Sequence, residues 1–90
     1  MRTLTLGEIR RIGIEVYSTV GNDFEIDSAE YEIVNEKREV VATGEPRIEG
    51  KKITMLFNTV EYGPGTYYVN FNFDILDETL KAKILVKVVK

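Results

Sequence analysis

The stretch "GPGTYYVNFNFDI", residues 63–75, joins a turn signal to a run of alternating side chains. Pro64 presets φ for the second position of a turn, and Gly65 accepts the positive φ that a type II turn needs at the third. In the run that follows, the apolar face consists of Tyr67, Val69, Phe71, Phe73 and Ile75, and the polar face of Tyr68, Asn70, Asn72 and Asp74. A period of two with one apolar face predicts a half-buried β-strand over residues 66–75.

The same period runs through "LKAKILVKVV", residues 80–89, where apolar side chains alternate with Lys81, Lys83 and Lys87. Shorter alternating segments lie upstream, separated by turn-forming stretches such as "TVGND", "NEKRE" and "IEGKK". The expected strands are roughly 2–6, 10–18, 25–34, 39–43, 46–49, 52–59, 66–75 and 79–89. Turns about ten residues apart are typical of a sandwich or barrel, and almost no helix is expected.

These strands predict the fold class: all-β, an antiparallel two-sheet sandwich of seven or eight strands. Ninety residues are too few for two cores without disulfides or metal, so residues 1–90 are expected to form one domain. The residues expected inside are Tyr67, Val69, Phe71, Phe73, Ile84 and Val86.

The last third of the chain resembles an immunoglobulin-like or fibronectin type III-like β-sandwich. "PGTYYVNF" resembles the penultimate strand of such domains, and "ETLKAKILVKVV" resembles their final strand. The resemblance covers about residues 52–89. The Cys and Trp of antibody-type domains are absent, which points to the wider Ig-like superfold, and this superfold does not fix a function.

The whole chain also resembles the small Ig-like accessory domains of tailed bacteriophage virions and prophage operons, including the N-terminal sandwich of baseplate upper proteins. The segments that carry this resemblance are "LTLGEIRRIGIEV", "SAEYEIVNEKREVVATGE" and "GPGTYYVNFNFDI". It implies a structural role in a phage tail or head.

The composition argues against an enzyme. Without histidine there is no imidazole base near neutral pH, and without cysteine there is no thiolate nucleophile or Cys-based zinc site. Ser18 and Ser28 have no nucleophile-activating partner nearby in the sequence. We therefore expect no catalytic residues and no cofactor.

Charge and hydropathy restrict partners and location. The net charge is −3, with acids concentrated in residues 15–49 and lysines in residues 79–90, so nucleic-acid binding is not expected. The N-terminal residues lack a signal peptide's apolar region, and no run reaches the length of a membrane span. The expected location is the cytoplasm as synthesised, or an assembled virion, and no membrane association is expected.

The polar row Tyr68, Asn70, Asn72 and Asp74 has two interpretations. As a carbohydrate site, the tyrosine ring would stack on a pyranose while the amides and carboxylate bind its hydroxyls. As the solvated face of a strand, the same residues would have cross-strand partners, which half-buried antiparallel strands normally show. The second interpretation is favoured.

An acidic segment, "GNDFEID", brings Asn22, Asp23, Glu25 and Asp27 close together in the sequence. Calcium needs several hard oxygen ligands, but this spacing lacks the glycine and the glutamate of an EF-hand loop. A loop of solvated acids is the favoured interpretation, and no metal site is predicted.

Apolar residues on the polar faces of the strands favour a protein partner or self-association. The candidate association patch is Leu56, Leu85 and Val89, with Val34 and Tyr17 as further members. The lysine row, which consists of Lys81, Lys83 and Lys87 with Lys90 at the end, could pair with Glu30 and Glu32 of a neighbouring strand or another subunit. It could equally guard an exposed strand against aggregation, and this second interpretation is favoured.

The sequence therefore predicts a non-catalytic structural or protein-interaction module, with a phage or prophage virion accessory protein as its context. The alternative is a carbohydrate-binding β-sandwich module that uses the exposed Tyr and Asn face.

Overall fold

The computed structural model of the chain describes residues 1–17 and 24–90. Its elements are β1 (Arg2–Thr5), β2 (Ile9–Glu15), β3 (Ser28–Asn35), β4 (Val40–Gly44), β5 (Arg47–Glu49), β6 (Lys52–Asn58), α1 (Thr59–Tyr62), β7 (Gly65–Ile75) and β8 (Glu78–Val89). The eight strands follow the expected ranges closely, although β2 ends earlier and β3 begins later than expected.

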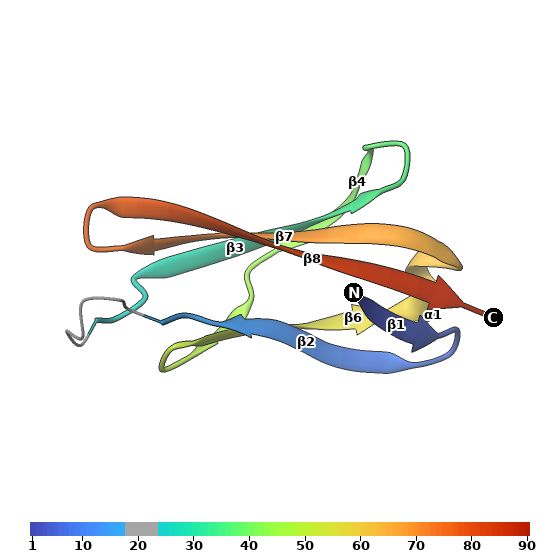
Figure 1. Cartoon of the computed structure of the whole chain (residues 1–90), viewed down its shortest axis with the longest axis horizontal. Helices are drawn as coiled ribbons and strands as arrows, with labels where there is room; N and C mark the ends of the chain where they lie inside the picture. The colour runs from blue at the N-terminus through green and yellow to red at the C-terminus, as the bar shows by residue number, and fades with distance from the viewer. Residues whose placement is uncertain (18–23) are drawn as a thin grey trace.

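The strands form two sheets, which Figure 1 shows as two layers. One sheet has the order β1-β8-β7-β3-β4 and the other the order β2-β6-β5. The predicted all-β, two-sheet architecture is confirmed. In the described part of the chain, no helix is long and apolar enough to cross a membrane.

The expectation of a wholly antiparallel sandwich is wrong at one edge, because β1 pairs with β8 in parallel. The two strands come from opposite ends of the chain, so no hairpin dictates their relative direction. The observed register places Leu4 beside Val88, and both side chains are buried. Burial of apolar side chains thus accompanies the parallel pairing.

The core lies between the two sheets. Its buried hydrophobic residues are Leu4, Ile12, Ile26, Ile33, Ile53, Met55, Phe57, Tyr67, Val69, Phe71, Phe73, Val86 and Val88. The predicted burial of Tyr67, Val69, Phe71, Phe73 and Val86 is confirmed, whereas Ile84, and Ile75 at the end of β7, are only half-buried. Because β7 lies between β8 and β3, its inward residues occupy the middle of the larger sheet.

The short helix α1 connects β6 of the smaller sheet to β7 of the larger one (Figure 1). The Asn58 side chain caps it by accepting a hydrogen bond from the Val60 N–H, and Gly63 ends it with φ 82°. Thr59 is fully buried; its hydroxyl donates to the Glu8 carbonyl at 2.7 Å and accepts from the Gly7 N–H at 2.9 Å. One buried hydroxyl therefore fixes the β1–β2 turn to the crossover between the sheets.

Tyr67 fixes the other side of this crossover. Its hydroxyl donates to the backbone carbonyls of Tyr62 and Gly63, at 2.5 and 3.0 Å. Burial, with a smaller contribution from the charge of Glu36, raises the pKa of the Tyr67 phenol, so it stays protonated and able to donate. The predicted positive φ of Gly65 is confirmed, at 144°.

Candidate functional site

The candidate site is the outer face of the five-stranded sheet, the face that points away from the three-stranded sheet. The register of β3, β7 and β8 arranges it in levels, each with one residue from each strand. Three levels, in the order β8, β7, β3, are Lys81 with Asn72 and Glu30, Lys83 with Asn70 and Glu32, and Leu85 with Tyr68 and Val34. Lysines thus lie on β8 and glutamates on β3, with β7 between them.

A fourth level follows the same order at the end of β3. Lys87 is in register with Thr66, and the Glu36 carboxylate accepts a hydrogen bond from the Thr66 N–H at 2.9 Å. Glu36 is the residue directly after β3. The lysine column and the glutamate column therefore continue to this level.

The level of Leu85, Tyr68 and Val34 is an apolar belt across this charged face. It continues onto β4, because Val40 is in register with Val34. Leu85 and Val34 are half-buried, Tyr68 is 37% exposed and Val40 is 54% exposed. Four strands therefore contribute to one continuous row, which we call the apolar belt.

Tyr68, the central residue of the proposed sugar site, is partly covered by its own sheet. The Lys83 ammonium lies 5.1 Å from the centroid of the Tyr68 ring, within the range of a cation–π contact. A pyranose that stacked on this side of the ring would have to displace the lysine. The contact favours the interpretation of the polar row as a strand face with cross-strand partners.

The other members of the polar row also have partners on neighbouring strands. The Asn70 amide donates to the Glu32 carboxylate at 3.3 Å. Asp74 accepts hydrogen bonds from Thr79 and Ser28, each at 2.7 Å and each to a different carboxylate oxygen. These two bonds, the one from Thr79 first, lower the pKa of Asp74.

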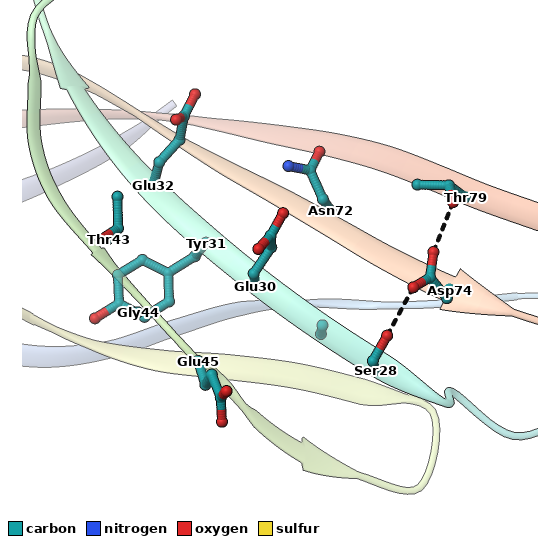
Figure 2. A pocket seen from close by; sticks show the side chains of 11 residues that line it. Ser28, Glu30, Tyr31, Glu32, Thr43, Gly44, Glu45, Asn72, Asp74 and Thr79 are labelled. Carbon is teal, nitrogen blue, oxygen red and sulfur yellow. Dashed lines mark hydrogen bonds between the residues drawn. The ribbon is translucent and has the colours of Figure 1, made fainter.

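A hollow on this face lies beside the glutamate column, and Figure 2 shows Glu30, Glu32 and Asn72 lining it. Its full lining is Ser28, Ala29, Glu30, Tyr31, Glu32, Thr43, Gly44, Glu45, Asn72, Asp74 and Thr79. The lining contains four carboxylate side chains and no lysine or arginine. Across the described residues, no group of acids could hold a metal ion.

The structure separates the predicted association patch. Leu85 and Val89 lie on β8 in the larger sheet and are half-buried, whereas Leu56 lies on β6 in the smaller sheet and is 53% exposed. Leu56 is in register with Arg11 there. The three residues therefore do not form one surface, because the chain crosses between the sheets after β6. Tyr17 lies beyond β2, and its hydroxyl donates to Glu15 at 2.7 Å.

Part of the acidic segment lies outside the described residues, namely Asn22 and Asp23, as does Ser18. Asp27 is described, and its carboxylate accepts a hydrogen bond from the Leu76 N–H at 3.0 Å. This carboxylate therefore holds the β7–β8 turn.

The lysine row lies on a strand that is covered on only part of its length. β1 pairs with β8 from Val86 to Val89, so within the described residues no strand pairs with the β1 side of β8 at Lys81 and Lys83. For that stretch, the role of these lysines as guards of an exposed edge stays a prediction.

Sequence reasoning missed Val40 and the level-by-level match of the two charged columns. The alternation of each strand gives its faces, but only the pairing register shows which residues share a level. Comparisons with protein-family models, curated proteins and solved structures find no match to this chain.

Proposed function

We propose that this chain is a non-catalytic structural or protein-interaction module that binds a protein partner through the outer face of its five-stranded sheet. The observation that carries the proposal is the apolar belt. Contiguous apolar area on an otherwise charged surface tends to mark a partner site.

An Ig-like form of the sandwich is part of the proposal, and the strand order supports it. In their order across each sheet, β2, β6 and β5 correspond to Ig strands B, E and D, and β8, β7, β3 and β4 to G, F, C and C′. The hydrogen bonds from Tyr67, at the start of β7, to the backbone just upstream resemble the tyrosine corner of such domains.

The proposed context is an accessory position in a phage or prophage virion. Its support is the sequence resemblance of "LTLGEIRRIGIEV" and "GPGTYYVNFNFDI" to such domains. A small sandwich with a docking face suits that role because it needs no catalytic cleft.

Two charge insertions of matched exposure test the docking face. Val40→Glu places a carboxylate in the apolar belt, and Leu56→Glu places one on the smaller sheet; the two side chains are 54% and 53% exposed. Proteins captured by the immobilised wild type are identified, purified and titrated against both variants by interferometry. We expect Val40→Glu to weaken binding about tenfold or more and Leu56→Glu to leave it unchanged.

Thermal melts of both variants check that the fold is intact. Equal effects of the two variants on every partner, including a second copy of the chain, would contradict the proposal. A glycan array tests the carbohydrate alternative: signal from the wild type that Tyr68→Ala abolishes, with no effect of Val40→Glu, would establish sugar binding instead.

A further inference from the structure

Two strands of the outer face carry the same order of charged and apolar side chains, with negative charges on β3 and positive charges on β8. Along β3 and the residue after it, the outward positions are Glu30, Glu32, Val34 and Glu36; along β8 they are Lys81, Lys83, Leu85 and Lys87. Both strands are antiparallel to β7, so they run in the same direction. Each glutamate therefore shares a level with a lysine, and the apolar residue of one strand shares a level with that of the other.

Within the described residues of a single molecule, no ion pair joins the two columns. β3 and β8 are two strand spacings apart, roughly 9–10 Å. Within the described residues, the ion pairs are Arg10 with Glu8 and Arg47 with Glu49, and neither belongs to the columns. The sheet thus presents opposite charges at matched levels without joining them.

From this pattern, and on the basis of the proposed docking role of this face, we infer that the partner is a second copy of the chain. The two copies pack outer face to outer face about a two-fold axis that runs nearly along β7. Such an axis keeps every level in place and exchanges the two sides of β7. It places β8 of one subunit over β3 of the other.

In this arrangement every level is complementary. Lys83 lies over the partner subunit's Glu32, Lys81 over the partner subunit's Glu30, and Leu85 over the partner subunit's Val34. Tyr68 lies at the axis; the Lys83 ammonium moves from the Tyr68 ring to the partner subunit's Glu32, and the ring then meets Tyr68 of the partner subunit. Because the interface is isologous, each charge pair forms twice.

The charges also select this axis over the other way of stacking the same faces. A two-fold axis across the strands would place β8 over β8, which brings lysines over lysines and glutamates over glutamates. Juxtaposed like charges disfavour that arrangement. An axis roughly 15° from β7 gives the crossing of about 30° at which aligned sheets pack.

The face is large enough for a weak dimer. Strand spacing and rise give the four levels described above and the further level of Ser28, Asp74 and Thr79, together with the flanking strands, an area of roughly 600 Å² for each subunit. The buried total of about 1,200 Å² lies at the lower end of specific interfaces. We therefore expect concentration-dependent association that added salt weakens.

Sedimentation velocity of the full chain, from roughly 1 μM to roughly 1 mM, measures the association. Lys83→Glu should weaken dimerisation about tenfold or more, because two like-charge contacts replace two ion pairs, and Glu32→Lys should do the same. Lys52→Glu is the matched control; it makes the same charge change on β6 of the other sheet and should have no such effect.

Charge exchange is the decisive measurement. In an equimolar mixture of Lys83→Glu with Glu32→Lys, the heterodimer regains two opposite-charge contacts, so the mixture should associate more tightly than either variant alone. The chain that carries both substitutions should dimerise by itself for the same reason. These rescues also exclude misfolding as the cause of the single-variant defects.

A wild type that stays monomeric to roughly 1 mM at low salt would overturn the two-fold dimer. So would a dimer that the single variants do not weaken, or one that mixing does not restore. Capture of a different protein that Val40→Glu disrupts would in that case leave the proposed docking function standing. If the chain neither self-associates nor captures another protein through this face, the proposed docking function is contradicted as well.

Discussion

Phe71 is the residue whose truncation tests the fold most directly. Its side chain is fully buried in the middle of β7, and its cross-strand neighbours are Tyr31 on β3 and Ala82 on β8. Phe71→Ala removes a buried aromatic ring and leaves a cavity that flanking strands on both sides hinder from collapsing. The expected loss in the free energy of unfolding is about 3–5 kcal/mol.

That loss is a large share of the total. A chain of this length is expected to have roughly 5–13 kcal/mol of stability. In urea, with a slope of about 1.5 kcal/mol per molar, the midpoint should fall by about 2–3 M, unless the variant is already unfolded in water. Chemical denaturation followed by circular dichroism measures this shift.

The matched control is Asn72→Ala, which changes the next residue on the opposite face of the same strand. Asn72 is half-buried on the outer face, and its truncation should cost less than about 1 kcal/mol. A smaller effect at Phe71 than at Asn72 would refute the register, because a slip of one residue exchanges the two faces of a strand.

Four further predictions address single contacts. Thr59→Val should lower the free energy of unfolding by about 1–3 kcal/mol, because it leaves the Gly7 N–H without its acceptor and removes one of the two hydrogen bonds to the Glu8 carbonyl, whereas Thr59→Ser should preserve it; urea unfolding compares them. Gly13→Ala should cost about 1–3 kcal/mol in the same assay, since its Cβ would lie 2.2 Å from the carbonyl oxygen of Ile53. Leu76 has φ 56°, so Leu76→Asn should relieve backbone strain and raise the free energy of unfolding by up to about 1 kcal/mol, which a higher thermal midpoint would show. The lowered pKa of Asp74 means that its carboxylate contributes stability above its ordinary value of 3.8 and loses it as pH falls through the folded value, so the wild type's advantage over Asp74→Asn should shrink below that pH in urea titrations.

The strands could be predicted because their side chains alternate. In β7, every second residue from Tyr67 to Phe73 is large and apolar, and a period of two has only one structural interpretation at this length. The two-sheet class follows from many short strands with regularly spaced turns. These features are local, so the sequence displays them directly.

The short helix α1 and the parallel edge could not be predicted in the same way. A single helical turn has too few residues for a hydrophobic period to appear. Its capping residues, Asn58 before it and Gly63 after it, were the available signal. The direction of β1 is set by its pairing with a strand from the far end of the chain, and no local pattern records such a pairing.

The sequence could predict which side of its strand each candidate residue occupies, but not which residues of different strands lie together on one surface. Tyr68 and Leu85 each fall on the outward side of their strands by alternation alone. The grouping of Leu56 with Leu85 failed because alternation says which side of a strand is wet, not which sheet the strand joins. Lys83 illustrates the same limit, since its contact with the Tyr68 ring depends on the pairing of β7 with β8.

The match between the two charged columns has a physical origin in the core. Ile33 on β3 and Val86 on β8 are both fully buried, and a slip of one residue in either strand would expose them and bury charges. A slip of two residues would keep the faces but shift a column by one level, which would bring a glutamate beside Leu85. Packing of the inner face therefore fixes the levels of the outer face. Because charge exchange between Lys83 and Glu32 restores association only when these two residues share a level, the same experiment that tests the dimer also measures the register of three strands.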